Sequence, residues 1–376
     1  MKTAPKAIVT LVLLAAFGGA AYFSFRQTDP AASALGGLLP SVQTTELNGF
    51  IALDVEPYFK DPRVIKLLAD NKLRVNATRI GSREMAARVV PGQIPDFFFP
   101  SGVVAANQIG DAARSAKVST AVYSPFYTPM VIASWTPIAQ MLSANGIAKE
   151  ISPKVWDVDF AKLTQTMLDK KRWKDLKESQ AYPVSKSVLV STTDVRKSNS
   201  AAMYLALTSF AMNNGDIVTD KATAQKTALR VAELFKRQGY QENYVNGNFD
   251  DYASIGIGKT PMAFIYENQM VTYALQKKGI GADMVLLYPQ PTIFNKVVFV
   301  TTNERAKALG ELLSNNAELQ RIAVDYGFRI GDSAYFAQTV KATGLAVEER
   351  ITQVIDPPSF DLMAEMIDVI SREMGQ

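Results

Sequence analysis

The sequence of 376 residues contains no cysteine and no histidine. Their absence excludes thiol nucleophiles, disulfide bridges, relays of the Ser-His-Asp type and nearly every zinc or copper site. Any metal ion would have to be held by carboxylate or tyrosine oxygens, and we expect no cofactor. A chain without cysteine is compatible with an oxidising compartment, because no wrong disulfide can form in it.

The chain also lacks a strong charge of either sign. Its 40 lysines and arginines against 36 acidic residues give a net charge of +4, and the longest basic run covers only residues 170–172. This scattered charge argues against nucleic acid as a partner. With 48% hydrophobic and 20% charged residues, the composition is that of a globular protein, and the length suits two lobes of roughly 150 residues each.

One long apolar run, residues 7–25, follows Lys2 and Lys6 and ends at Arg26. The positive charge before it predicts that the rest of the chain is exported across the cytoplasmic membrane. Small residues near its end would suit signal-peptide cleavage, but the run is long enough to span a bilayer. We therefore expect residues 1–26 to form an uncleaved signal-anchor, a single transmembrane helix in the inner membrane with the body in the periplasm. The missing cysteine excludes a lipoprotein. Residues 27–44 have the composition of a tether.

Three predicted strands early in the body end in polar loops. They cover residues 47–53, 73–77 and 96–99, and the loops after the second and third carry Ser82 and Ser101. In a parallel α/β sheet, ligands bind outside the carboxyl ends of the strands. These loops are therefore candidates for one wall of a binding site, although each alone is equally compatible with an ordinary connection.

A similar pattern lies in the middle of the chain. An apolar run at 187–190 predicts a short strand, and 201–207 predicts the start of a helix. Between them, Ser198, Asn199 and Ser200 precede the first helical turn. Their side chains can cap the unpaired N–H groups there or help to bind a ligand, and the sequence alone favours the cap.

Two β-like runs with prolines, 122–134 and 284–301, are spaced about 150 residues apart. Proline is disfavoured at a sheet centre, so these runs suit segments that cross between domains. We expect one lobe to comprise 45–133 and 290–376, and the other 134–289.

Residues 256–260, Gly-Ile-Gly-Lys-Thr, superficially match a phosphate-binding loop. That motif requires glycine where this chain has Ala253, and a helix after the threonine, where Pro261 and a strand-like run at 262–265 follow. We therefore expect no ATP site here. The run instead brings Tyr266 and Glu267 to the start of a helix.

Taken together, four motifs in this order resemble the type 2 periplasmic solute-binding proteins, the receptors of ABC importers. The motifs are Ile80-Gly-Ser-Arg-Glu-Met-Ala86, Thr192-Thr-Asp-Val-Arg-Lys-Ser-Asn-Ser200, Tyr266-Glu-Asn-Gln269 and Leu319-Gln-Arg-Ile-Ala-Val-Asp-Tyr-Gly-Phe-Arg329. The closest resemblance is to the sulfate/molybdate type, and it covers about residues 45–331. It implies an α/β fold of two Rossmann-like lobes joined by two crossing strands, with the ligand enclosed between the lobes.

The resemblance also implies the residues that bind the ligand. From the first lobe they are Ser82, Arg83 and Ser101, and from the second Thr193, Asp194, Arg196, Ser198, Asn199, Tyr266 and Glu267. An anchored chain departs from the family, whose members are usually cleaved soluble receptors or lipoproteins. This departure puts delivery to an importer in doubt.

These residues leave three functions to compare. The first is a non-catalytic receptor for a small polar solute, serving an ABC permease. The second is a membrane-tethered sensor or assembly partner of other membrane proteins. An enzyme using Asp194 or Glu267 as a base is disfavoured, because no histidine or cysteine assists it. Those carboxylates would repel a bare oxyanion unless Arg83 and Arg196 neutralise them, so anionic and amine-bearing ligands both remain candidates.

Overall fold

The structure is a computed structural model that describes residues 44–239, 241, 243, 245–277 and 280–375. The predicted anchor, residues 1–26, lies outside this part of the chain, as does the tether apart from Thr44. No helix in the described ranges combines the length and apolar character needed to cross a bilayer. From Thr45 onward the chain forms one compact unit.

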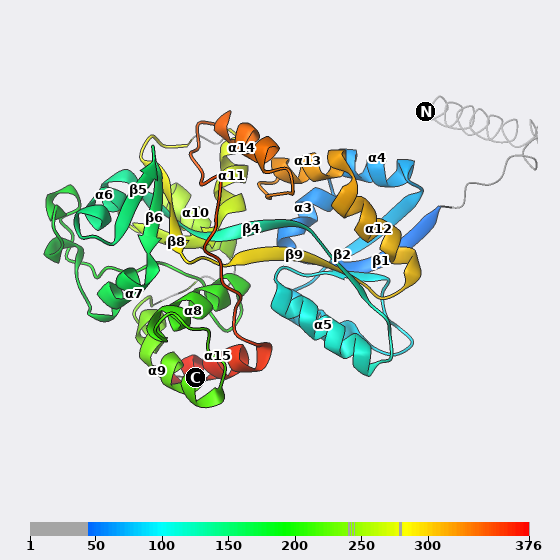
Figure 1. Cartoon of the computed structure of the whole chain (residues 1–376), viewed down its shortest axis with the longest axis horizontal. Helices are drawn as coiled ribbons and strands as arrows, with labels where there is room; N and C mark the ends of the chain where they lie inside the picture. The colour runs from blue at the N-terminus through cyan, green and yellow to red at the C-terminus, as the bar shows by residue number, and fades with distance from the viewer. Residues whose placement is uncertain (1–43, 240, 242, 244, 278–279, 376) are drawn as a thin grey trace, which may run out of the picture. The chain divides into compact units, whose positions relative to one another are not determined.

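The strands alternate with helices along much of the chain (Figure 1). The strands are β1 (Thr45–Ile51), β2 (Leu73–Arg79), β3 (Phe97–Phe99), β4 (Ala121–Trp135), β5 (Ala148–Ser152), β6 (Val155–Asp159), β7 (Met262–Tyr266), β8 (Met284–Gln290) and β9 (Phe294–Thr301). The α-helices are α3 (Glu56–Phe59), α4 (Pro62–Asp70), α5 (Val103–Ser115), α6 (Thr136–Ala144), α7 (Phe160–Leu168), α8 (Asn199–Met212), α9 (Lys221–Lys236), α10 (Val245–Ile255), α11 (Glu267–Leu275), α12 (Glu304–Asn315), α13 (Ala317–Asp325), α14 (Ser333–Lys341) and α15 (Phe360–Glu373).

The described strands are hydrogen-bonded in the order β2-β1-β3-β9-β4-β8-β6-β5, with β7 also paired to β4. Strand β1 runs parallel to both β2 and β3. The long strand β4 pairs with β9 through residues 121–129 and with β7 and β8 through residues 130–135. Its two halves therefore belong to two differently composed parts of the sheet, as expected for a strand that crosses between lobes.

Side chains of β4 alternate between two hydrophobic cores. Val131 and Ala133 pack into one core, and Met130 and Ile132 into the other. This alternation follows from the pleat, which directs successive side chains to opposite faces. Because both faces are covered here, residues 130–133 are apolar on both sides of the strand, which explains this short hydrophobic run.

Helix α8 lies inside the second core. All ten residues from Ser200 to Ser209 are buried, and α8 packs against α7 and α9. A helix that is apolar around its whole circumference is buried by helices or sheet on all sides. Its start at Asn199 is therefore held rigidly by packing.

Several local predictions differ from the structure. The predicted strand at 187–190 is reduced to isolated bridges, because only Ser191 reaches the edge of β7, where its N–H donates to the Met262 carbonyl. The loop after β2 feeds two short 3-10 turns instead of an α-helix. The second proline-bearing run is two strands, β8 and β9, separated by residues 291–293. The strand predicted after Pro261 is confirmed as β7.

The C-terminal helix belongs to the second core. Helix α15 packs against α9 in the second core, whereas the sequence placed residues 290–376 in the first lobe. The chain reaches it from α14 through residues 342–359, drawn in orange to red in Figure 1. This segment is bound to the residues between β8 and β9 by a bridge between Thr292 and Val354.

The start of α4 provides a prediction about acid stability. Asp61, which is 7% exposed, accepts hydrogen bonds from Arg63 and, at 3.0 Å, from the Tyr326 hydroxyl after α13. The bonds from Arg63 lower the pKa of Asp61 from 3.8 to about 2. A lowered carboxyl pKa stabilises the fold above pH ~4 and loses this effect as the pH falls toward 2. We expect Asp61→Asn to cost about 1–2 kcal/mol at pH 6, and less at pH 3, in urea unfolding.

The matched control is Asp70→Asn, which removes the exposed partner of Lys66 on the same helix. Exposed pairs contribute little, so this variant should remain close to the wild type at both pH values. An Asp61→Asn deficit that is equal at pH 3 and pH 6 would show that the loss is not electrostatic.

Candidate ligand-binding site

The parallel strands β1, β2 and β3 end side by side, and the residues after them form one side of the candidate site. Asp54 follows β1 in the turn Leu53–Val55, and Ser82 follows β2 in the turn Ser82–Glu84. Ser101 follows β3 and is 6% exposed. The pairing of β1 with both neighbours brings these three turns to one edge of the sheet.

Hydrogen bonds connect the three turns. The Ser101 hydroxyl donates to Asp54 Oδ1, and the Ser101 N–H donates to Ser82 Oγ at 3.0 Å. Burial raises the pKa of Asp54, and the bond from Ser101 offsets part of that rise. Both polar groups of Ser101 are thus used to hold its neighbours in place.

The opposite side of the site comes from α8 and β7. Asn199, the first residue of α8, donates from Nδ2 to the Tyr266 hydroxyl at 3.2 Å. Tyr266 ends β7 and is 5% exposed. Burial raises the pKa of Tyr266, as does the negative charge of Asp54, while Arg83 opposes the rise. The contact between Asn199 and Tyr266 thus joins the start of α8 to the end of β7.

The two sides touch at Gly102 and Arg83. Gly102 has φ +97°, and a β-carbon at this position would lie 3.4 Å from Asn199 Nδ2 and 3.5 Å from Asn295 Oδ1. Arg83 Nη1 donates to the Arg196 carbonyl at 3.4 Å. We refer to the residues that meet here as the Ser101 cluster: Asp54, Ser82, Arg83, Ser101, Gly102, Asn199, Tyr266 and Asn295.

Two members of the cluster have unsatisfied polar atoms. Oδ2 of Asp54 is buried and has no hydrogen-bond partner among the described residues. Asn295 lies in β9 and its side chain is fully buried. Neither its Oδ1 nor its Nδ2 has a hydrogen-bond partner among the residues that the structure describes. Buried polar groups in proteins are nearly always hydrogen-bonded, so these atoms can take a partner from water or from a solute.

Two predicted hydroxyls do not belong to the cluster. Oγ1 of Thr193 and Oγ of Ser198 both lie 2.9 Å from Oγ of Ser200, and all three side chains are buried. Ser198 is the N-cap residue of α8, but its side chain does not cap the helix. The predicted side-chain cap is therefore wrong, because the hydroxyl is turned toward Ser200. A role of these residues in ligand binding stays a prediction.

The predicted charged pair Asp194 and Arg196 is local. Arg196 Nε donates to Asp194 Oδ1 at 2.8 Å, and the Arg196 N–H donates to the same oxygen at 2.9 Å. Burial would raise the pKa of Asp194, but the bonds from Arg196 lower it overall. The carboxylate is thus neutralised within its own loop, and the carbonyl of Arg196 accepts from Arg83 of the cluster.

Glu267 takes part in a buried ion pair away from the cluster. It is 0% exposed and accepts from Arg329 Nε at 2.6 Å, from Arg329 Nη2 at 2.8 Å and from the Tyr288 hydroxyl at 2.6 Å. Burial alone would lower the pKa of Arg329, but the charge of Glu267 raises it. Both oxygens of Glu267 are occupied by protein donors, so its contacts are structural in this conformation.

The sequence prediction missed Asp54, Gly102 and Asn295. Asp54 lies just before a helix start that contains proline. Acidic residues are common near helix starts because they interact favourably with the helix dipole, so the sequence pattern did not single it out. Asn295 could have been noticed, because it is a polar residue inside a predicted apolar strand. The sequence identified Gly102 only as part of a loop. Its positive φ, which only the structure reveals, shows why glycine is needed there.

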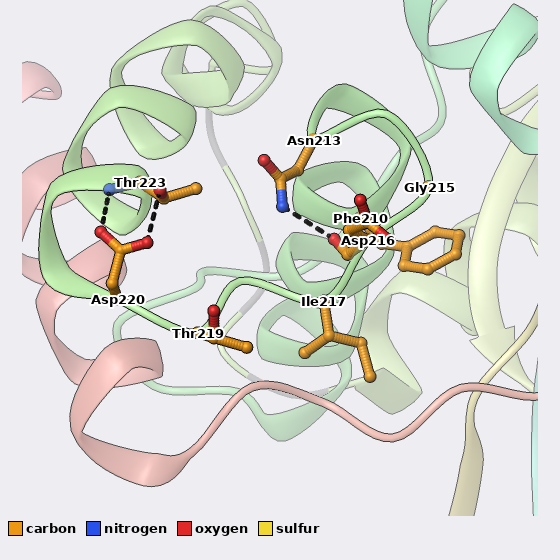
Figure 2. A pocket seen from close by; sticks show the side chains of 8 residues that line it. All are labelled: Phe210, Asn213, Gly215, Asp216, Ile217, Thr219, Asp220 and Thr223. Carbon is orange, nitrogen blue, oxygen red and sulfur yellow. Dashed lines mark hydrogen bonds between the residues drawn. The ribbon is translucent and has the colours of Figure 1, made fainter.

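Two surface hollows lie outside the cluster. The larger, about 640 Å³, lies between the end of α8 and the start of α9 and is shown in Figure 2. Its Asp220 already accepts from the N–H of Thr223 at 2.9 Å and from its hydroxyl at 2.7 Å, as in an ordinary helix cap. The smaller, about 300 Å³, is lined by Val103 and Lys296 and by residues 356–360. Neither contains a predicted site residue, and neither shows an unpaired buried polar group.

Among the described residues, no three acidic side chains are grouped so that they could hold a metal ion. Asp54 is the one carboxylate of the cluster as defined above. The donor set instead suits a polar organic or inorganic solute, which would be bound by hydrogen bonds.

No protein-family model matches the chain, and no curated protein matches it. Solved structures do match. An ABC transporter protein from Clostridium perfringens is 12% identical with a TM-score of 0.53, covering 88% of this chain and 100% of its own. A Trichodesmium protein (IdiA, FutA) in complex with iron and citrate is 11% identical with a TM-score of 0.50, covering 88% and 99%. The sulfate-binding protein from Mycobacterium tuberculosis is 13% identical with a TM-score of 0.49, covering 85% and 96%.

At these identities the likeness concerns the fold. The chain has the mixed-sheet α/β fold of these proteins, over nearly the whole described body. The resemblance to type 2 periplasmic solute-binding proteins is therefore confirmed as a structural similarity. What each of these proteins binds remains a property of that protein.

Proposed function

We propose that this chain is a non-catalytic solute-binding protein that captures a small polar ligand at the Ser101 cluster. The observation that carries the proposal is the meeting of two polar walls, one at the carboxyl ends of β1 to β3 and the other at α8 and β7. Buried atoms of Asp54 and Asn295 in this cluster have no hydrogen-bond partner among the described residues. The shared fold with an ABC transporter protein supports this function.

Binding would require the two walls to separate. Asn199 lies close to Gly102 in this structure, so a ligand enters the cluster only when the start of α8 moves away from the start of α5. Reclosure around the ligand would exclude water and strengthen each hydrogen bond. The structure, in which the two walls of the cluster are in contact, has the conformation expected after closure.

The experiment is a screen of the purified body, residues 27–376, against oxyanions, amino acids and sugars by thermal shift and small-angle scattering. At least one probe should raise the melting temperature and reduce the radius of gyration. If no probe has either effect, the proposed function is wrong.

A matched pair of variants connects binding to the cluster. Asn199→Ala removes the donor to Tyr266 and should weaken binding at least tenfold, about 1.4 kcal/mol. Ser198→Ala removes only a hydroxyl that faces Ser200, and should leave the dissociation constant within about twofold. Isothermal titration gives both values. Equal effects of the two substitutions would place the ligand elsewhere.

The second candidate is a membrane-tethered sensor or assembly partner, and the apolar run at residues 7–25 favours it. We propose that the body lies in the periplasm and that this run anchors it in the inner membrane. Mass spectrometry of protein from its host would show whether residues 1–26 are retained. Co-purification with permease subunits would favour an importer, and co-purification with other membrane proteins alone would favour the sensor.

A further inference from the structure

Two opposite charges line the smaller surface hollow. Lys296 of β9 and Asp356, which lies shortly before α15, are both part of its lining. Lys296 is half-buried and Asp356 is exposed. Among the residues that the structure describes, neither side chain has an ion-pair or hydrogen-bond partner. The two charges are therefore available to act on each other across the hollow.

Lys296 is bound to the first wall of the Ser101 cluster. Its carbonyl accepts from the Gly102 N–H at 2.9 Å, and the nearby Val298 N–H donates to the Pro100 carbonyl at 3.1 Å. The first turn of α5 lines the hollow together with Lys296. This part of β9 therefore stays with the start of α5 when the walls separate.

Asp356 is bound to the second core, which also contains α8. The residue before it, Ile355, packs against that core, and its N–H donates to the Thr292 carbonyl at 2.9 Å. After it, Pro357 and Pro358 restrict the backbone up to α15, which packs against α9. Asp356 therefore stays with the second wall.

The hollow is narrow enough for the two charges to attract each other. A sphere of its volume, about 300 Å³, is about 8 Å across, and the Debye length at physiological salt is also about 8 Å. Apolar side chains of Val103, Val104 and Phe360 line the hollow beside the charges, which weakens the screening by water. Separation of the walls would lengthen the distance between the charges and reduce their attraction.

We infer that Lys296 and Asp356 act as a charge pair that favours the closed arrangement of the two walls. This inference rests on the closure that the proposed function requires, and it gives the segment before α15 a part in that closure. Because apparent affinity scales with the fraction of molecules in the binding-competent state, the pair also sets how tightly any solute is held. Its effect should decrease as salt screens the two charges.

The test measures the separation of the walls directly and without a solute. Since the chain has no cysteine, spin labels can be attached through Ser115→Cys on α5 and Leu229→Cys on α9, both at exposed positions. Electron–electron resonance then gives the distance distribution in the body, residues 27–376. Lys296→Glu and Asp356→Lys should each raise the ratio of open to closed molecules at least threefold. The double variant, in which the charges are exchanged, should return to within twofold of the wild type.

The matched controls are Arg74→Glu and Glu46→Lys. They change the net charge by the same amounts, but their exposed pair joins β2 to β1 on one side of the molecule. Neither control should alter the distance distribution. In the wild type, 1 M salt should increase the open fraction, because the Debye length falls to about 3 Å.

A distance distribution that is insensitive to both charge reversals and to salt would overturn the inference. So would an exchanged double variant that is as open as the single variants. Isothermal titration with a charged probe that binds the wild type provides a second readout: both single reversals should weaken binding about three- to tenfold. Opposite changes in affinity would show that the two charges act on the solute and not on each other. If no compound of the screen binds but the reversals still open the walls, the proposed function fails and the charge pair stands.

Discussion

Replacing Arg329 with methionine is expected to lower the free energy of unfolding by about 3–5 kcal/mol. Arg329 is 4% exposed, and its Nε and Nη2 donate to both oxygens of Glu267 at 2.6 and 2.8 Å. Without it, the carboxylate of Glu267 would stay buried with the Tyr288 hydroxyl as its main donor. Urea unfolding followed by tryptophan fluorescence measures the loss, provided that the m-value is unchanged.

Two further variants separate the charge effect from lost packing. Arg74→Met removes a pair with Glu46 in which both side chains are more than half exposed, and should cost less than about 1 kcal/mol. Adding Glu267→Gln to Arg329→Met should recover part of the loss, because the amide needs no opposite charge. A loss below about 1 kcal/mol for Arg329→Met alone would contradict the prediction.

The ion pair also holds the segment that leads to α15. Arg329 Nη2 donates to the Glu348 carbonyl, and the Glu348 N–H donates to the Tyr288 hydroxyl at 3.0 Å. Further along, the Thr292 N–H donates to the Gln353 carbonyl. Residues 342–359 are thus a third passage of the chain between the two cores, besides β4 and the β8–β9 return. Any separation of the walls of the Ser101 cluster must be compatible with this passage.

The sequence predicted the parts of the fold that depend on local patterns. Proline in an apolar run indicated a crossing segment, and the structure contains β4 as a single strand of 15 residues. The rule that ligands bind at the carboxyl ends of parallel strands selected Ser82 and Ser101, which the structure brings together. Both predictions use periodicity and chain order, which a sequence contains.

The remaining site residues depend on partners far away in the chain. Glu267 and Arg329 are 62 positions apart, and no local pattern reveals that the two side chains neutralise each other. Asp194 was placed in the site by the family resemblance, and Arg196, which the sequence offered as a neutralising charge, pairs with it in the structure. Asp54 and Asn295 were missed for the converse reason, since an unpaired group is recognised only when all neighbours are known.

Gly102→Ala is expected to weaken ligand binding more than tenfold and to lower the free energy of unfolding by about 1–3 kcal/mol. The backbone at Gly102 has φ +97° and ψ 141°, a region that is essentially restricted to glycine. A methyl group there would also lie 3.4 Å from Asn199 Nδ2 and 3.5 Å from Asn295 Oδ1. Those two distances are ordinary van der Waals contacts, so the effect comes from the strained backbone. Its relaxation would shift the start of α5 relative to that of α8 and hinder the two walls from closing.

The control is Gly110→Ala in the same helix α5. A β-carbon at Gly110 meets no atom within 4 Å, and alanine is favoured over glycine by up to about 1 kcal/mol in a helix. This variant should bind as the wild type does and unfold at an equal or higher urea concentration. Scattering with and without a probe that binds the wild type then decides the cause. If Gly102→Ala is destabilised but still contracts fully with that probe, the approach of Gly102 to Asn199 is a feature of packing and not of ligand capture.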